Sequence, residues 1–272
     1  MIANVLSIAG SDPSGGAGIQ ADLKTCSALG AFGMTVITAL TAQSTRGVTG
    51  VVALEPEFVV AQLDTLMLDV EIHAVKVGMV ANVGIAEAIA SVLNRKDWRA
   101  PVVLDPVMVA KGGAPLLAPA AAKAVRDLLL PLATIVTPNL PEAGALLEIG
   151  AAVNRQEMEE QGRRLMALGP GAVLLKGGHL EGPDSPDLWV TSEGFKWMEG
   201  PRVNTRNTHG TGCTLSSALA ALLAQGKSLS EAAVGAKTYV ARTIEQADKL
   251  NVGSGHGPVH HFHALWGQKE SS

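Results

Sequence analysis

A glycine-rich segment at residues 208–214 (Thr-His-Gly-Thr-Gly-Cys-Thr) runs directly into an apolar stretch at 215–223. Because Gly210 and Gly212 are one residue apart, successive backbone N–H groups can turn toward one point and form an anion-binding nest. The helix that we expect to begin here adds unpaired N–H groups and the positive end of its dipole. The pattern therefore predicts a phosphate site.

Cys213 stands at this helix start. A thiol held there is expected to titrate below its ordinary pKa of about 8.5 and to be partly thiolate near neutral pH. The alternative is a glycine turn that caps a core helix around a small buried cysteine.

Four further residues carry charge or oxygen ligands. Asn139 and Glu142 are three residues apart at an expected helix start, where both could face a hydrated Mg²⁺; alternatively they are an N-cap and an acid of the first turn. Asp105, at a strand end, is a second candidate for metal or phosphate chemistry. Lys176 ends a buried strand, and is either a phosphate clamp or an edge residue whose amine reaches water.

Other patterns are weaker. Residues 16–21 (GAGIQA) match the dinucleotide fingerprint G-x-G-x-x-A, but the next strand ends at Gln43 without the expected acid. This glycine loop could instead close around a small substrate, or be a plain turn. The Walker A pattern is absent, and 226–228 (GKS) is more typical of a turn after a helix. Four histidines between 256 and 263 lie in a tail expected on the surface, without partner carboxylates or thiols, which favours no metal site.

Short apolar runs alternate with helix-length amphipathic segments along the chain. This alternation predicts a mostly parallel sheet with helices on both faces. The predicted strands are 4–9, 34–41, 74–78, 101–105, 133–137 and 172–176, with an extra strand at 47–54 and a hairpin at 187–199. The predicted helices are 17–30, 56–69, 82–95, 119–130, 139–149, 155–168, 212–225 and 229–249. Ligands of such sheets bind beyond the carboxyl ends of the strands, where the polar residues named above gather.

Composition narrows the class of protein. The chain has 272 residues, 47% of them hydrophobic and 3% aromatic, and a net charge of -4 without a basic block. We expect a single domain over residues 1–272, with no nucleic-acid partner and no membrane span. Two cysteines and no signal-like N-terminus favour a reducing cytoplasm over a disulfide framework.

Several motifs carry a resemblance. The Gly-Thr-Gly-Cys loop resembles the Gly-x-Gly-Asp loop of the ribokinase-like superfamily, and Asn139 to Glu142 resembles its Asn-x-x-Glu motif. The whole chain is similar, in order, to bacterial hydroxymethylpyrimidine/phosphomethylpyrimidine kinases of thiamine biosynthesis. The similar segments are 9–22 (AGSDPSGGAGIQAD), 38–43 (TALTAQ), 104–108 (LDPVM), 137–143 (TPNLPEA), 175–179 (LKGGH) and 257–263 (GPVHHFH).

The resemblance implies a ribokinase-like α/β kinase that uses ATP and Mg²⁺. Its substrates would be 4-amino-5-hydroxymethyl-2-methylpyrimidine and then the monophosphate, with a side activity on vitamin B6 and a homodimeric, cytoplasmic state. A nicotinamide-dependent oxidoreductase and a non-catalytic relative remain as alternatives.

The resemblance also implies roles for residues. Catalysis would use Cys213, Lys176, Gly210, Thr211 and Gly212. The pyrimidine would contact Gln43, Gly10, Met79 and Asp22. ATP would contact Asn139, Lys176, Thr208 and Lys237. Mg²⁺ would be held by Glu142 and Asp105.

Overall fold

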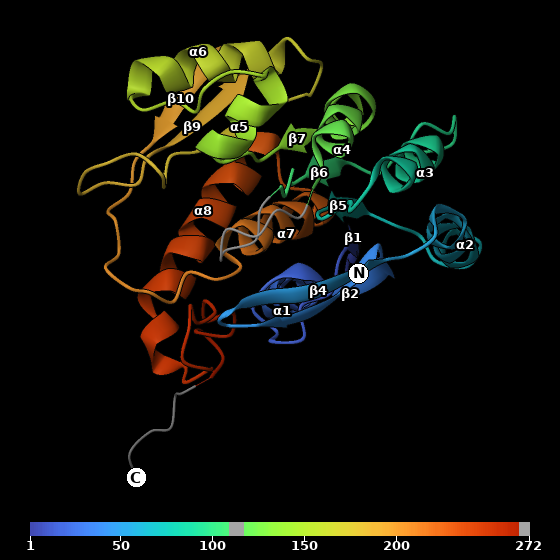
Figure 1. Ribbon diagram of the computed structural model, residues 1–272, viewed down its shortest axis with the longest axis horizontal. Coiled ribbons are helices and arrows are strands. Elements are labelled where there is room, and N and C mark those ends of the chain that lie inside the picture. The colour runs from blue at the N-terminus through green and yellow to red at the C-terminus, as the bar shows by residue number, and fades with distance from the viewer. Residues whose placement is uncertain (109–116, 267–272) are drawn as a thin grey trace.

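The computed structural model describes residues 1–108 and 117–266, and its centre is an eight-stranded sheet (Figure 1). The strand order is β10-β9-β8-β7-β6-β5-β1-β2. The strands are β1 (Asn4–Ala9), β2 (Phe32–Ile37), β5 (Ala74–Val77), β6 (Val102–Leu104), β7 (Ile135–Val136), β8 (Val173–Lys176), β9 (Asp187–Thr191) and β10 (Gly194–Met198). The pairs from β2 to β8 are parallel, and β9 and β10 add an antiparallel edge.

Eight α-helices in the described part connect and cover the strands. They are α1 (Gly18–Ala28), α2 (Pro56–Met67), α3 (Val83–Leu93), α4 (Pro119–Ala124), α5 (Leu140–Leu147), α6 (Arg155–Met166), α7 (Thr211–Ala224) and α8 (Leu229–Glu245). The predicted helix 119–130 is shorter as an α-helix, because a π turn at Val125–Leu129 and a 3₁₀ turn at Leu130–Leu132 complete it. The predicted helix 229–249 likewise ends in a 3₁₀ turn, Ala247–Lys249.

Two apolar cores lie on opposite faces of the sheet. Leu6 and Ile8 of β1 join the core that packs under α2 to α6, whereas Val5 joins the core under α1, α7 and α8. Successive strand residues point to opposite faces, so continuously apolar strands are what a sheet covered on both sides requires. The prediction of a mostly parallel α/β sheet is confirmed.

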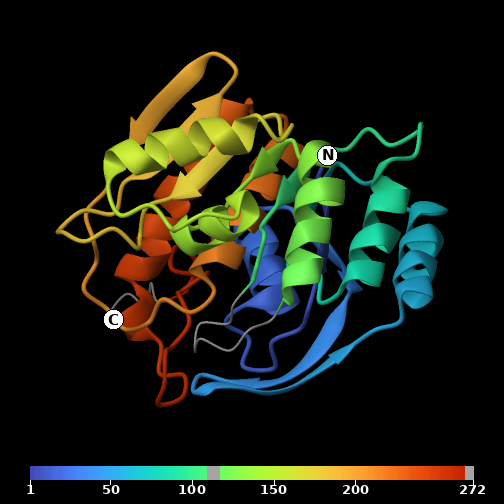
Figure 2. The ribbon, with the colours of Figure 1, turned by 45° about the horizontal axis from the view of Figure 1, so that its top comes forward.

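The predicted strand 34–41 is wrong in one respect, because the chain breaks at Thr38 into two strands. The second of these, β3 (Ala39–Ser44), leaves the main sheet and pairs antiparallel with β4 (Gly47–Ala53). The Thr38 hydroxyl donates to the Met79 carbonyl at 2.6 Å, which fixes the break. Figure 2 shows this β3–β4 hairpin (blue) reaching away from the main sheet toward the C-terminal segment (red).

The C-terminal segment was expected to lie on the surface, and this expectation is wrong for residues 257–261. Val259, His260 and His261 are at most 5% exposed. The backbone of Val259 donates to the carbonyl of His209, and the Thr214 hydroxyl lies 3.0 Å from Nε2 of His261. The segment therefore packs directly behind the glycine-rich loop that precedes α7.

Candidate active site

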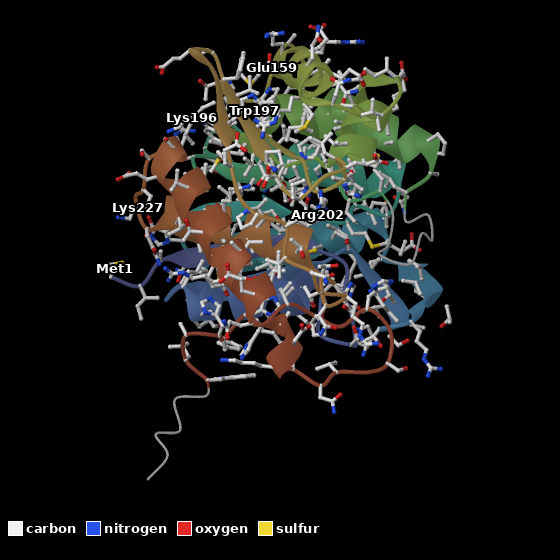
Figure 3. The ribbon with its side chains drawn as sticks, turned by 90° about the vertical axis from the view of Figure 1, so that its left-hand side faces the viewer. Met1, Glu159, Lys196, Trp197, Arg202 and Lys227 are labelled. Carbon is white, nitrogen blue, oxygen red and sulfur yellow. The ribbon has the colours of Figure 1, made fainter. Side chains whose placement is uncertain are left out.

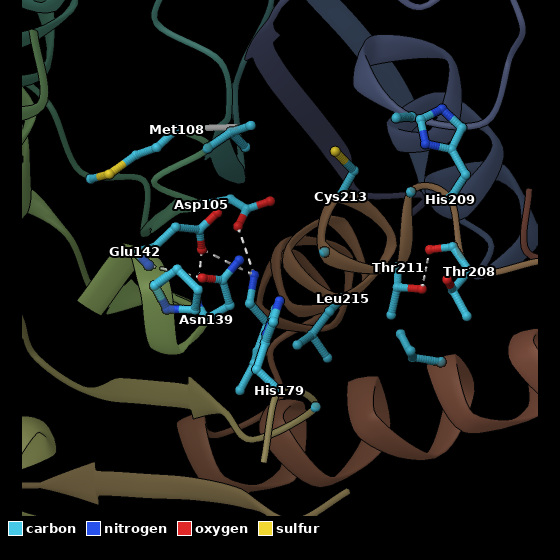
Figure 4. Close-up of a pocket in the computed structure, with 18 of the residues that line it drawn as sticks. Asp105, Met108, Asn139, Glu142, His179, Thr208, His209, Thr211, Cys213 and Leu215 are labelled. Atoms are coloured by element: carbon cyan, nitrogen blue, oxygen red, sulfur yellow. Dashed lines mark hydrogen bonds and ion pairs between the residues drawn. The ribbon is translucent and has the colours of Figure 1, made fainter. Parts of the chain in front are cut away.

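A cleft of about 1500 Å³ opens at the carboxyl ends of the parallel strands, above the start of α7. It brings together residues that the sequence scatters over all of the chain. Those that were predicted as site residues and line it are Gly10, Gln43, Met79, Asp105, Asn139, Glu142, Lys176, Thr208, Gly210, Thr211, Gly212, Cys213 and Lys237. In Figure 4, Cys213 lies between the group of Asp105, Asn139 and Glu142 and the loop of Thr208, His209 and Thr211.

The start of α7 has the geometry of an anion site. Gly210 caps the helix with φ +80°, and a Cβ there would lie 1.7 Å from the Gly16 carbonyl oxygen, so no other residue fits. Gly212 is not in the left-handed region, so of the two glycines only Gly210 needs a positive φ in the predicted nest. A Cβ at Gly212 would instead lie 3.2 Å from the Lys176 ammonium, so this glycine gives Lys176 access to the helix start.

Cys213 lies in the first turn of α7 and is partly exposed in the cleft. The prediction of a lowered thiol pKa is wrong: burial raises the pKa of Cys213 to about 11. The positive charge of Lys76 and a hydrogen bond from the Gly18 backbone oppose this rise, whereas Asp22 and Asp105 add to it. Desolvation of the thiolate outweighs the helix start.

A charged cluster stands next to α7. The Lys176 ammonium is 3.1 Å from Asp105 and 3.7 Å from Glu142. Asp105 is 1% exposed and also accepts hydrogen bonds from Thr137 and Ser216. Burial raises the pKa of Glu142 to about 7, with Lys176 opposing the shift and Asp105 adding to it. Two carboxylates thus share one ammonium at the position where a phosphate would meet the α7 amides.

Asn139 and Glu142 form a reciprocal capping box at the start of α5. Asn139 Oδ1 accepts from the Glu142 amide at 2.8 Å, and Glu142 Oε2 accepts from the Asn139 amide at 2.7 Å. The helix-capping alternative for this pair is therefore correct as local structure. Both residues also line the cleft.

The opposite end of the cleft is suited to a flat ring with polar edges. A Cβ at Gly10 would lie 2.9 Å from the Met79 sulfur, so Gly10 leaves room for that side chain. Gln43 Oε1 accepts from the Thr41 hydroxyl at 3.2 Å, and Gln43 Nε2 lies 3.4 Å from His209 Nε2. The sequence suggested that Gln43 lies at the end of a strand of the main sheet. In the structure it lies instead in the β3–β4 hairpin.

Lys237 of α8 lines the far wall, but its ammonium is already paired. It lies 2.6 Å from Asp187 and 3.1 Å from the Ser185 carbonyl. Arg202, labelled in Figure 3, holds the loop beside it by donating to the carbonyls of Gly178 and Leu180. The structure places Lys237 in the cleft wall; its contact with ATP phosphate stays a prediction.

Asp22 is the one predicted site residue that does not line the cleft. Its carboxylate is 1% exposed and is occupied by Ser7, Ser217 and Lys76. Direct contact with a substrate would require breaking a buried ion pair, so we withdraw that role.

Sequence reasoning missed the pair of Asp12 and His209. His209 Nε2 lies 2.7 Å from Asp12 Oδ2, and Asp12 also accepts from the amides of Gly16 and Ala17. The pair joins the first glycine loop to the loop before α7. Each residue could have been noticed, since each lies inside one of the two glycine-rich motifs. Their pairing could not be predicted, because they are 197 positions apart and a single sequence does not show which distant residues meet.

The described part of the chain contains no helix long and apolar enough to cross a membrane. Cys26 and Cys213 are both free.

Comparison with known proteins agrees with this geometry. The hydroxymethylpyrimidine/phosphomethylpyrimidine kinase of Salmonella typhimurium is 57% identical over 97% of this chain and 98% of its own. A pyridoxal kinase of Bacillus subtilis, solved as an ADP complex, has a TM-score of 0.90 at 35% identity, covering 98% of this chain and 100% of that one. A phosphomethylpyrimidine kinase of Clostridium difficile has a TM-score of 0.78 at 42% identity, covering 90% and 100%. Residues 12–260 match the family described as phosphomethylpyrimidine kinase, and the chain belongs to that family.

Proposed function

We propose that this chain transfers the γ-phosphoryl group of ATP to the hydroxymethyl oxygen of 4-amino-5-hydroxymethyl-2-methylpyrimidine. A second transfer, to the monophosphate just formed, gives the pyrophosphate used in thiamine biosynthesis. The observation that carries the proposal is that Gln43, Cys213 and Lys176 line one cleft around the glycine-capped start of α7. Ring recognition, proton acceptance and phosphate binding are thereby brought together.

Gln43 serves ring recognition. A side-chain amide offers one donor and one acceptor face, which matches the edge of an aminopyrimidine. The Gln43 side chain is held from behind by Thr41 and His209, so its orientation is set before the ring binds. Met79, 7% exposed, supplies an adaptable apolar surface beside it.

Phosphoryl transfer needs positioning and charge neutralisation more than covalent chemistry. Of the first amides of α7, that of Thr211 donates to the Thr208 carbonyl at 3.3 Å, whereas those of Gly212 and Cys213 have no partner within the helix and are therefore available to the γ-phosphoryl oxygens. Lys176 lies 3.2 Å from the position of a Gly212 Cβ, so its ammonium can join the same oxygens. Thr208 stands at the entrance of this loop, with its carbonyl accepting from the Thr211 hydroxyl at 2.7 Å.

Cys213 is placed to take the proton of the attacking hydroxyl. The hydroxymethyl oxygen forms its bond to the γ-phosphorus as the bond from that phosphorus to the β,γ-bridging oxygen breaks. ADP leaves with the bridging oxygen, and the hydroxyl proton passes to the thiolate form of Cys213. Since the free thiol has a raised pKa, proton acceptance requires that the thiolate be stabilised by charges around the sulfur. The second transfer depends less on this step, because a phosphate oxygen is already ionised near neutral pH.

The residues fit Mg²⁺ as the accompanying metal. Described residues hold no group of three or more His, Cys, Asp or Glu side chains that could bind an ion. Mg²⁺ in kinases is held by one or two carboxylates together with water and substrate phosphates, and Glu142 and Asp105 are two such carboxylates. When bound with ATP, Mg²⁺ would neutralise phosphate charge at this end of the cleft. Asn139 would orient Glu142 through the capping box.

The pyridoxal kinase similarity supports a second substrate. Pyridoxal also presents a hydroxymethyl group on a flat six-membered ring, and the structures superpose over nearly the whole chain. We propose a side activity on vitamin B6 compounds at the same site. Competition would test it: the hydroxymethylpyrimidine should inhibit pyridoxal phosphorylation with an inhibition constant equal to its own KM.

We also propose a cytoplasmic homodimer. The β3–β4 hairpin exposes Leu40, Val51 and Val52 at 43–64%, and an isolated two-stranded hairpin is marginally stable in water. A second copy of the chain would cover this surface. Light scattering on the purified chain should give twice the monomer mass of 28.0 kDa, and Val52→Asp should reduce it; a wild-type monomer would reject the dimer.

The proposed function is tested by mass spectrometry of the products formed from MgATP and the hydroxymethylpyrimidine. Appearance of the monophosphate followed by the pyrophosphate supports it. ADP release without either product, or no turnover of either acceptor, would reject it.

A further inference from the structure

A buried polar network lies behind Cys213 and outside the cleft contacts described above. The Asp22 carboxylate accepts from Ser7 at 2.5 Å, from Ser217 at 2.6 Å and from the Lys76 ammonium at 2.8 and 3.0 Å. All four residues are at most 3% exposed. Lys76 is among the largest side chains of the chain that are fully buried.

The network surrounds the turn of α7 that carries Cys213. Ser217 is one helical turn after Cys213 on the same helix, and its hydroxyl donates to Asp22 on α1. Lys76, on β5, is the only member of the network that lines the cleft together with Cys213 in the described part of the chain. The network thus connects α1, β5 and α7 one helical turn from Cys213.

The Lys76 ammonium has a fixed place near the cleft floor. A Cβ at Gly78 would lie 2.7 Å from Lys76 Nζ, so the missing side chain at Gly78 is what gives the ammonium its room. Asp22 binds it through both oxygens from the other side. The cation therefore stays where it is without help from solvent.

Stability alone does not account for such a pair. Replacing a buried ion pair by apolar residues of similar volume is often neutral or stabilising, because desolvation offsets the attraction. A lysine kept fully buried at the floor of a reaction cleft is better explained by the charge it supplies there.

We propose that Lys76 is a positioning residue for Cys213: held by Asp22, which Ser7 and Ser217 fix in turn, its ammonium is a permanent cation that stabilises the thiolate form of Cys213, and this thiolate then accepts the proton of the attacking hydroxyl. The other charged groups that face the sulfur are Asp22 from α1, Asp105 beyond β6 and Lys176 from β8. Lys76 is the largest influence that lowers the pKa of Cys213 against burial, and it exceeds the opposing influence of Asp22.

The test is the rate of Cys213 alkylation by iodoacetamide between pH 7 and pH 10.5, read by mass spectrometry of the peptide. Lys76→Met should slow Cys213 alkylation by about tenfold or more at pH 8. The reason is that each unit by which the thiol pKa rises lowers the thiolate fraction by about tenfold. Lys76→Arg keeps a cation and should restore part of the rate. The double variant Lys76→Met, Asp22→Asn leaves no unpaired buried charge and should also be slow.

Two controls separate charge from folding. Cys26, 2% exposed on α1, reports loosening of the same region, because its alkylation rises when the region opens. Lys227→Met removes one exposed lysine (Figure 3) and should leave the Cys213 profile unchanged. A wild-type Cys213 profile in both Lys76→Met variants would overturn the proposal. So would faster alkylation of Cys213 and Cys26 together, which would make the network a structural support.

The proposal depends on the proposed function in one respect only, namely that the Cys213 thiolate accepts the hydroxyl proton of the substrate. Alkylation needs neither ATP nor pyrimidine. A chain without kinase activity would therefore reject the proposed function while leaving the alkylation result to decide the role of Lys76.

Discussion

Two glycines at opposite ends of α7 allow the anion site to be tested against a matched control. Gly210 precedes the helix with φ +80°, and Gly226 follows it with φ +82°. A Cβ at Gly210 would lie 1.7 Å from the Gly16 carbonyl oxygen, whereas a Cβ at Gly226 would have nothing within 4 Å. An alanine at either position has the same backbone conformation imposed on it, but only at Gly210 must the backbone also move.

The magnitudes follow from this difference. Each alanine should cost about 1–2 kcal/mol of unfolding free energy for the left-handed conformation. Gly210→Ala must in addition displace the loop by about 1.7 Å to reach the 3.4 Å at which ordinary contact begins. Because a misplacement of about 1 Å can cost roughly 100-fold in rate, kcat/KM for ATP should fall by at least that factor in Gly210→Ala. It should stay within about twofold in Gly226→Ala.

The assay combines urea unfolding with steady-state kinetics at varied ATP and saturating pyrimidine. The expected result is a loss of about 1–2 kcal/mol of unfolding free energy in Gly226→Ala, a larger loss in Gly210→Ala, and a loss of kcat/KM in Gly210→Ala alone. Equal kcat/KM in Gly210→Ala and Gly226→Ala, with both variants folded, would refute the assignment of the α7 start as the phosphate site.

Three further predictions concern single side chains. Gln43→Ala should raise KM for the pyrimidine by roughly 5- to 150-fold, from about 1–3 kcal/mol of lost recognition, and leave KM for ATP unchanged; a parallel loss of ATP affinity would make Gln43 structural. Glu142→Gln should raise the Mg²⁺ concentration for half-maximal activity by roughly 10- to 100-fold, whereas Glu231→Gln, in the exposed capping box of α8, should not; an unchanged Mg²⁺ titration would remove Glu142 from the metal site. Burial raises the pKa of Asp12, but hydrogen bonds from His209 and Ser14 outweigh it and lower that pKa to about 2 from an ordinary 3.8. The stabilisation from this carboxylate is therefore present above pH 3.8 and is lost as pH falls toward 2. Asp12→Asn should lower the free energy of unfolding by ~1–2 kcal/mol near neutral pH and reduce the fall of the urea midpoint at acid pH. An unchanged fall at acid pH would show that the pair of Asp12 and His209 contributes nothing to stability.

The layered fold was accessible from the sequence because its signals are local. Apolar runs such as 102–104 are buried on both faces, and capping residues such as Asn139 start their helices where predicted. The break at Thr38 was not predictable, because residues 34–41 are β-prone throughout and the break depends on a hydrogen bond to Met79, 41 residues away.

The sequence predicted which residues would line the cleft better than it predicted their chemical properties. All of the predicted site residues except Asp22 line the cleft, since the carboxyl ends of parallel strands meet at one edge. The prediction for the thiol pKa of Cys213 was wrong because it considered only the helix start, which is visible in the sequence. The burial that outweighs the helix start depends on tertiary packing. Asp22 was misassigned for a similar reason: its buried partner Lys76 is 54 residues away.

The central claim, that Cys213 accepts the hydroxyl proton within a cleft that performs both transfers, is tested most directly by a product time course of Cys213→Ser. A general base is typically worth about 10²–10⁴-fold. The account predicts that formation of the monophosphate slows by a factor in that range, while conversion of added monophosphate to the pyrophosphate slows much less. Equal slowing of both steps, or a wild-type rate for the first, would contradict it.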